Sequence, residues 1–277
     1  MASAEAPAAR PILYSYWRSS CSHRVRIALN LKGIDYEYRA VNLLKGEQSD
    51  PEFMKLNPMK FVPALVDGDA YLEDKYPQRP LLPQDLKKKA LNIQIASIVC
   101  SGIQPLHNLT LVRFIEQKVG TGESIPWVQQ QIDRGFTGCL HRHVPSFLVI
   151  TAIFAALLPS RKFVLEILLT KTSFPAFTLG ISLPLSAFSL CNHVLTFTPN
   201  GSAVENMIKG CAGKFAMGDE VQLADVFLAP QIFAAVTRYQ TDMSNYPTLA
   251  RLHGQYMTHP AFEAALPDRQ PDAPSSG

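Results

Sequence analysis

The pattern of apolar and polar positions near the start of the chain predicts a strand, a helix and a second strand. The apolar run 12–16 is typical of a buried strand, and the apolar positions that follow predict a helix over 21–32 that ends at Gly33. Residues 36–41 predict the second strand. The intervening helix is long enough for the two strands to lie parallel.

A third short strand is predicted after the polar loop 42–50 and one or two helical turns over 51–56. Pro63 precedes its apolar residues, and since proline cannot donate to a sheet ladder, we place Pro63 at the first position of this strand. Pro63 is also a candidate for a cis peptide bond that turns the chain beside the helix N-terminus. Val62 would then offer its backbone to a peptide-like ligand.

Beyond a proline-rich linker over 77–83, the pattern becomes helical. Leucine, isoleucine and valine recur at helical spacing over 86–119, which predicts a long pair of helices with a break at Pro105. Residues 127–137 begin a further amphipathic helix, and Asp225 begins an apolar one.

Length and charge exclude some classes of protein. The chain has 277 residues and a net charge of +3, so it has room for one large or two ordinary domains. Residues 139–201 contain four basic residues and one acidic residue, so the rest of the chain is neutral overall. No basic stripe with interleaved aromatic residues occurs, which argues against nucleic-acid binding.

Five cysteines stand at wide and irregular spacing, which argues against a disulfide framework and against zinc. We therefore expect reduced thiols in an intracellular protein. Neither end carries a targeting signal that we identify, and we expect 1–9 and the tail 267–277 to be flexible.

The strongest candidate for chemistry is the run Ser19, Ser20 and Cys21 at the start of the first predicted helix. Unpaired backbone N–H groups and the helix dipole favour an anion there, so a thiolate of this chain or of a bound thiol would be stabilised. Serine is also the ordinary residue that caps a helix, so Ser19 or Ser20 could serve that purpose alone. The local pattern leaves both interpretations open.

Longer motifs resemble those of one enzyme family. The first two are Ser19-Ser20-Cys21-x-x-Arg24-Val25-Arg26-Ile27-Ala28-Leu29 and Asn57-Pro58-x-x-x-Val62-Pro63-Ala64-Leu65. Further matches are Gln104-Pro105-Leu106-x-Asn108-Leu109, Gly210-Cys211-Ala212-Gly213-Lys214, Leu223-Ala224-Asp225-Val226-Phe227-Leu228-Ala229-Pro230-Gln231, Arg238-Tyr239 and Tyr246-Pro247-Thr248-Leu249. The chain resembles the zeta class of cytosolic glutathione transferases, the maleylacetoacetate isomerases, over roughly 11–69, 71–137 and 203–274.

The resemblance implies the cytosolic glutathione transferase fold, an α/β thioredoxin-like N-terminal domain followed by an all-α C-terminal domain. We expect the first domain over 10–76, a linker over 77–85 and a helical substrate domain over 86–266. It also implies a cytoplasmic homodimer that uses glutathione to isomerise maleylacetoacetate, a dicarboxylic acid of tyrosine and phenylalanine breakdown, to fumarylacetoacetate. A weak peroxidase or conjugating activity is compatible with this, whereas the absence of a Cys-x-x-Cys motif argues against dithiol chemistry.

The resemblance also assigns roles to residues of this chain. Ser19 would donate to the glutathione thiol and lower its pKa, and Cys21 would assist or react covalently. Ser20 is a further catalytic candidate, and Arg238 would hold a substrate carboxylate. Arg238 could instead be a helix-end residue that interacts with the dipole. The residues expected to contact glutathione or substrate are Lys45, Gln48, Val62, Pro63, Gln104 and Asn108. Without the resemblance, Gln104 and Asn108 would be ordinary helix surface.

Two departures from the family pattern bear on activity. After Ala70 the chain runs directly into 71–76, where the family has another strand and then an acidic residue and a serine that hold the γ-glutamyl end of glutathione. We expect 70–76 to be a stub of under two helical turns, with a sheet edge left unpaired or covered by another segment. This loss favours a second hypothesis, a catalytically impaired variant.

The second departure is the apolar block 138–202, which separates two halves of a helix that is continuous in the family. Its length and low charge allow a membrane hairpin and hence a membrane-associated transferase. We favour irregular, translated non-coding sequence, because the block lacks sustained periodicity and interrupts a helix. We expect the flanking halves to meet in space, so that Phe136 lies near Val204. We also expect Asp225 to support folding rather than catalysis, with Gln222 a weak partner in a capping box.

Overall fold

The computed structural model describes residues 10–68, 72–137 and 204–274, and these residues belong to one compact unit. The predictions about residues 138–202 lie outside the described residues. The helices and strands have the following bounds: β1 Ile12–Ser15, α1 Ser20–Lys32, β2 Glu37–Ala40, η1 Glu47–Ser49, α2 Pro51–Leu56, β3 Ala64–Val66, α3 Leu72–Lys75, α4 Leu86–Ser97, η2 Ile98–Ile103, η3 Gln104–His107, α5 Leu109–Lys118, α6 Ser124–Thr137, α10 Val204–Lys209, α11 Leu223–Thr237, η4 Met243–Asn245, α12 Pro247–Met257, α13 Pro260–Glu263 and η5 Pro267–Arg269.

The strands form a three-stranded sheet in the order β2-β1-β3. β1 pairs parallel with β2, with Ile12 opposite Glu37, and antiparallel with β3, with Ile12 opposite Val66. The predicted parallel strand–helix–strand unit is therefore confirmed. The predicted cis peptide bond between Val62 and Pro63 is also present, immediately before β3.

Helix α1 begins and ends where its sequence signals predict. Ser19 caps its N-terminus, and Gly33 ends it in the left-handed region with φ of 70°, which glycine adopts without a steric penalty. Apolar Ile27 and Leu29 are fully buried in this helix. Arg26 is equally buried, although no carboxylate pairs with it among the described residues.

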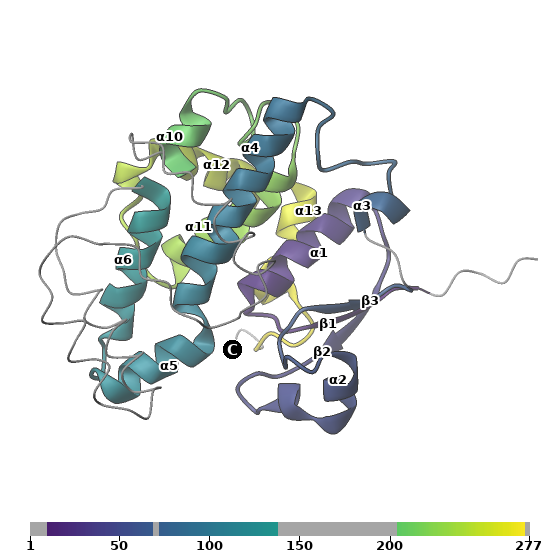
Figure 1. Cartoon of the computed structure of the whole chain (residues 1–277), viewed down its shortest axis with the longest axis vertical. Helices are drawn as coiled ribbons and strands as arrows, with labels where there is room; N and C mark the ends of the chain where they lie inside the picture. Colours follow the sequence, from purple (N-terminus) through teal and green to yellow (C-terminus); the bar gives the residue numbers. More distant parts are fainter. Residues whose placement is uncertain (1–9, 69–71, 138–203, 275–277) are drawn as a thin grey trace, which may run out of the picture. The chain divides into compact units, whose positions relative to one another are not determined.

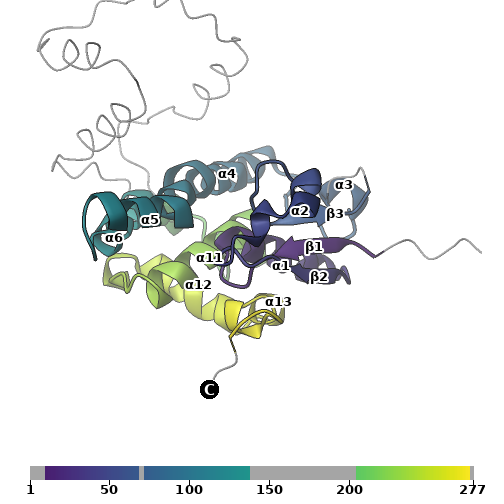
Figure 2. The same cartoon turned by 90° about the horizontal axis from the view of Figure 1, so that it is seen from below.

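Helix α11 lies at the centre of the helical part. It contacts α1, α4 and α12. Figure 2 shows α4, α5 and α6 along one side of α11, with α12 and α13 along the other. Figure 1 shows α1 beside the sheet, so α1 is shared by the sheet and the helical part. The cavity described below is formed at this junction.

The predicted break near Pro105 is confirmed. The helix that starts with α4 passes through the π-helical segment η2 and the 3₁₀ turn η3, and α5 then begins after Asn108. By length and composition alone, residues 86–118 could cross a membrane, a test that the core helix of a soluble protein also passes. Ile95, Val99 and Ile103 on this stretch are buried in the main core cluster.

The two helix halves that flank residues 138–202 meet, as predicted. α6 contacts α10, and Phe136 and Val204 belong to the same buried cluster. Tyr246 closes over Phe136 edge to face, with ring centroids 5.3 Å apart, and its hydroxyl donates to Asp133. Tyr246 directly precedes α12, so it connects α6 to the start of that helix.

Asp225 is a folding residue, as expected. It is fully buried, and its carboxylate accepts hydrogen bonds from the N–H groups of Gln222 and Ala216 and from the Tyr256 hydroxyl. The capping box between Gln222 and Asp225 is formed, and the Gln222 side chain also accepts a hydrogen bond from Asn92 on α4. Asp225 therefore ties the start of α11 to the preceding turn and to α12.

After β3 the chain closes through polar contacts on the short helix α3, which has four residues as the stub prediction implied. Asp67 accepts from Lys75 at 2.6 Å and from the Tyr76 hydroxyl at 3.0 Å. Lys32, at the end of α1, forms an ion pair of 3.2 Å with Glu73. Within the described ranges, β3 pairs with β1 alone, so its other edge lacks a strand, as expected.

The prediction of a flexible tail is wrong for residues 267–274. Gln270 is buried and donates to the carbonyl oxygens of Ala264 and Leu266, and Asp272 accepts hydrogen bonds from Trp17 and Tyr38. The proline-rich composition suggested disorder, but these contacts with the start of the chain hold the tail in place.

Candidate functional site

The site is built around the loop between β1 and α1. Ser19 has extended backbone angles, and its Oγ accepts a hydrogen bond of 3.2 Å from the Ser22 N–H, as an N-cap residue does. This bond uses a lone pair of the hydroxyl and leaves its proton available. Ser19 also lines a cavity, so the two interpretations of this serine are compatible: it caps the helix, and its proton is free to be donated to a bound anion.

The cavity has a volume of about 410 Å³. Its wall comes from the β1–α1 loop, the 43–48 region, residues 60–62, the η3–α5 segment and the end of α11. The lining residues are Tyr16, Arg18, Ser19, Ser20, Cys21, Leu43, Leu44, Gln48, Lys60, Phe61, Val62, Gln104, His107, Asn108, Leu109, Thr110, Val112, Arg113, Arg238 and Tyr239. This volume suits a small organic ligand.

Most of the predicted site residues meet in this cavity: Ser19, Ser20, Cys21, Gln48, Val62, Gln104, Asn108 and Arg238 line it. Lys45 and Pro63 do not. Lys45 is exposed in the turn that follows Asn42, and Pro63 is the residue beyond the cis bond that presents Val62. Their predicted ligand contacts remain untested.

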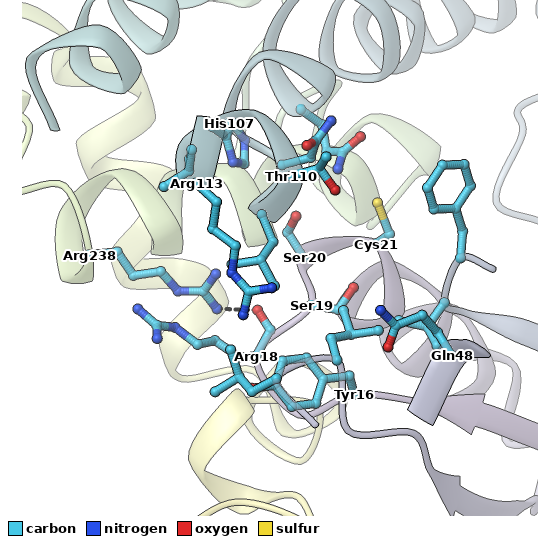
Figure 3. Close-up of a pocket in the computed structure, with 18 of the residues that line it drawn as sticks. Tyr16, Arg18, Ser19, Ser20, Cys21, Gln48, His107, Thr110, Arg113 and Arg238 are labelled. Carbon is cyan, nitrogen blue, oxygen red and sulfur yellow. Dashed lines mark hydrogen bonds between the residues drawn. The ribbon is translucent and has the colours of Figure 1, made fainter. Parts of the chain in front are cut away.

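Cys21 lies half-buried at the start of α1, and Figure 3 shows its sulfur near Ser20. Burial raises the pKa of the Cys21 thiol, and nearby Arg24 only partly opposes this. Cys21 is therefore protonated at neutral pH, which makes it a weaker nucleophile than a helix N-terminus alone suggests.

Positive charge gathers on the opposite side of the cavity. Arg18, Arg113 and Arg238 come from the β1–α1 loop, α5 and the end of α11, and Figure 3 shows their side chains converging. Lys60 adds a fourth cation to the wall, while none of the described lining residues is acidic. An arrangement of this kind favours a ligand with carboxylate groups.

Arg238 stands at the end of α11, and its side chain enters the cavity. Its backbone N–H donates to Ala234 at the end of α11, and its guanidinium reaches into the cavity and donates to the Arg18 carbonyl oxygen. Burial and the charge of Arg18 lower the pKa of Arg238 to about 10, so it remains a cation at neutral pH. Arg238 therefore links the end of α11 to the loop that carries Ser19.

Two arginines and one histidine of the cavity wall were not identified from the sequence. Arg18 directly precedes Ser19, and Arg113 shares a face of α5 with Leu109 and Val112, a spacing that could have indicated it. His107 is buried, its Nε2 lies 2.8 Å from Gln231 Oε1, and burial lowers its pKa. His107 is therefore neutral at pH 7 and adds no charge to the arginine group.

Asn108 and Gln48 differ in how much hydrogen bonding they leave for a ligand. Asn108 caps α5, since its Oδ1 accepts from the Leu111 N–H and its Nδ2 donates to the Pro105 carbonyl. Gln48 Oε1 is buried and has no hydrogen-bond partner among the residues that the structure describes. A buried amide oxygen without a partner is costly, so Gln48 fits a role in binding a peptide-like ligand with N–H donors.

A thioredoxin-like sheet, an attached helical part and a serine at a helix N-terminus define the chain as a cytosolic glutathione transferase. The sequence model of the glutathione S-transferase N-terminal domain matches residues 18–74. A zeta-class glutathione S-transferase of Euphorbia esula is 44% identical, over 99% of this chain and 98% of the relative. The chain belongs to the zeta class of glutathione transferases, the family of the maleylacetoacetate isomerases.

Animal and bacterial members of the family match equally completely. A maleylacetoacetate isomerase of Rattus norvegicus is 36% identical, with 97% of both chains covered. A maleylacetoacetate isomerase from Anaeromyxobacter dehalogenans has a crystal structure with bound dicarboxyethyl glutathione and citrate in the active site. It is 31% identical, covers 96% of this chain and 95% of that chain, and has a TM-score of 0.64.

Proposed function

We propose that this chain catalyses the glutathione-dependent cis–trans isomerisation of maleylacetoacetate to fumarylacetoacetate. The observation that carries the proposal is the placement of Ser19 at a helix N-terminus and three arginines on one cavity. The names of the relatives and the ligands in the related crystal structure agree with it.

When bound, glutathione supplies a thiolate that adds to the conjugated double bond, permits rotation about the resulting single bond and is then expelled. In this proposal the Ser19 hydroxyl donates to the thiolate, and the free N–H groups and dipole of α1 add further stabilisation. Both effects lower the pKa of the thiol and thus raise the fraction that reacts at neutral pH.

The arginines hold the dicarboxylate and stabilise negative charge that develops on its carbonyl oxygen during thiolate addition. Arg238 binds one carboxylate, and Arg18 and Arg113 bind the other or the carbonyl oxygen. Val62 and Gln48 hold the peptide part of glutathione through backbone and amide hydrogen bonds, and Gln104 and Asn108 complete the substrate side. Cys21, kept protonated by burial, assists as a hydrogen-bond donor rather than as a nucleophile.

The impaired variant remains the second candidate, and a specific observation favours it. Asp67 and Lys75 pair with each other directly after β3, where the family pattern has the segment that holds the γ-glutamyl group. Loss of that segment weakens glutathione binding without altering Ser19 or the arginines. The two candidates thus differ in affinity for glutathione rather than in the chemistry of the cavity.

Isothermal titration of the full chain with glutathione, followed by an isomerase assay, separates these candidates. Millimolar or tighter binding with turnover supports the enzyme, and absence of both supports the impaired variant. Arg113→Gln and Arg238→Gln should each raise the KM for the dicarboxylate about 10-fold or more, since each removes a charged hydrogen bond. Lys118→Gln, an exposed cation at the end of the same α5 helix, serves as the control.

We also propose that the chain is a homodimer in the cytoplasm, with residues 10–76 as its glutathione domain and 86–266 as its substrate domain. Family membership supports the homodimer, the cytoplasmic location and the division into two domains. Sedimentation analysis and cell fractionation would test them, and association with membranes would favour the third candidate, a membrane-associated transferase.

A further inference from the structure

Asp272 connects the C-terminal tail to the loop that carries Ser19. Its Oδ2 accepts a hydrogen bond of 3.0 Å from the Trp17 N–H, and its Oδ1 accepts one of 2.6 Å from the Tyr38 hydroxyl. Trp17 lies in the β1–α1 loop, and Tyr38 lies on β2. One carboxylate therefore bridges this loop to the neighbouring strand.

The rest of the tail holds Asp272 in place. Gln270 is buried and its side chain donates to two carbonyl oxygens at the end of the α13 segment. Pro271 and Pro274 flank Asp272 on either side and restrict the backbone. Burial and the hydrogen bond to Asp272 raise the pKa of Tyr38, so its hydroxyl remains a donor across the physiological range.

Arg26 holds the same loop from the inside. Its guanidinium donates to the carbonyl oxygens of Tyr16 and Trp17, to the Ser15 hydroxyl and to the carbonyl oxygen of Ala265, where the tail begins. Both backbone polar groups of Trp17 are thus hydrogen-bonded: Arg26 donates to its C=O, and Asp272 accepts from its N–H. The next two residues, Arg18 and Ser19, line the cavity.

We propose that Asp272 is a positioning residue that fixes residues 16–19, so that the Ser19 hydroxyl and the Arg18–Arg238 contact keep their places in the cavity. Asp272 does not line the cavity and touches no reacting atom. It acts through Trp17, which directly precedes Arg18. The Arg18 carbonyl oxygen accepts a hydrogen bond from the Arg238 guanidinium. The effect of Asp272 on catalysis rests on the proposed function. Its effect on the order of residues 16–19 does not depend on any activity.

The test compares full-chain Asp272→Ala, Asp272→Asn and the control Asp268→Ala, which removes an exposed carboxylate of the same tail. In Asp272→Ala, we expect faster hydrogen exchange in the peptide covering 16–19 and about a 10-fold or larger rise in the KM for the dicarboxylate. Asparagine can still accept from the Trp17 N–H and donate to Tyr38, so Asp272→Asn should lie between wild type and alanine. Asp268→Ala should match wild type.

A merely structural role predicts different data. It would lower the fraction of active protein and speed exchange throughout, while the KM stays unchanged. That result, or equal behaviour of the asparagine and alanine variants, would overturn the proposal. If wild type binds neither glutathione nor a dicarboxylate, the proposed function fails, and exchange at 16–19 still decides whether Asp272 fixes the loop.

Discussion

Among the single residues of the site, Ser19 is required both to cap α1 and to donate a hydrogen bond to a thiolate. Its Oγ already accepts from the Ser22 N–H, and its proton remains available for a ligand. Substitutions can separate these duties, because an aspartate caps a helix as well as serine does but carries no proton to donate at neutral pH.

We predict that Ser19→Asp keeps the stability of wild type, whereas Ser19→Ala loses about 1 kcal/mol of unfolding free energy. Both variants should lose about 100-fold or more in kcat/KM, since the donor to the thiolate is gone. Ser19→Thr should retain both properties. Urea unfolding and the isomerase assay check this, and an active Ser19→Asp variant would contradict the role of the proton.

His23 illustrates how a buried titratable group couples stability to pH. It packs edge to face on Phe233, and its Nε2 has no hydrogen-bond partner within the described part of the chain. Burial, together with the charges of Arg26, Arg238 and Arg24, lowers its pKa well below the ordinary value. The folded chain therefore keeps His23 neutral. The unfolded chain takes up a proton as pH falls through about 6.5, so stability is full above that pH and falls below it.

We predict that His23→Phe is at least as stable as wild type at pH 7, because the ring packing remains and an unpaired nitrogen is removed. Between pH 6.5 and 5, its stability should fall less steeply, by up to about 1.4 kcal/mol per pH unit. Urea unfolding across this range measures the slope. His107 is present in both proteins and cancels in the comparison, so equal slopes would show that His23 does not contribute.

At the scale of elements, the start of α11 depends on a single buried carboxylate. Asp225 holds the N–H groups of Gln222 and Ala216 and the Tyr256 hydroxyl of α12. Burial raises the pKa of Asp225, and the hydrogen bonds from these donors offset that rise only in part. The capping box of Gln222 and Asp225 is thus reinforced by tertiary contacts.

We predict that Asp225→Ala loses about 2–4 kcal/mol of unfolding free energy, since three donors lose their acceptor. Tyr256→Phe should lose less, because it leaves the two backbone contacts in place. At a temperature where each variant is folded, kcat should match wild type, as Asp225 lies outside the cavity wall. Thermal unfolding and the isomerase assay check this, and a selective loss of kcat would assign Asp225 a part in catalysis.

Helices and strands with local sequence signals could be predicted from the sequence. The tertiary contacts between elements far apart in the chain could not. Ser19 and Gly33 mark both ends of α1, and Pro105 marks the break before α5. The arginine group needs three elements to converge, and nothing in the local pattern indicates that Arg113 faces Arg238. Asp272 lies 255 residues from its partner Trp17, so composition alone misrepresents the tail as flexible.

For the molecule as a whole, the central question is whether residues 138–202 matter to the fold. The flanking helices meet through described residues: Phe136 and Val204 are buried in one cluster that also contains Ile132, Ile208 and Leu249. Glu205 of α10 further accepts from the N–H groups of Thr248 and Leu249 at the start of α12. These buried apolar contacts and hydrogen bonds therefore stabilise the packing of α6, α10 and α12 against one another.

We predict that a variant in which a short glycine–serine connection replaces residues 138–202 folds and binds glutathione as tightly as the intact chain. We also predict that this variant is markedly more soluble than the intact chain. The apolar composition of these residues favours association, and shortening a connection between ends that already meet lowers the entropy lost on folding. Calorimetry with glutathione and the soluble fraction after expression measure the two effects. Equal solubility would count against an exposed apolar block, and loss of affinity would mean that these residues support the cavity.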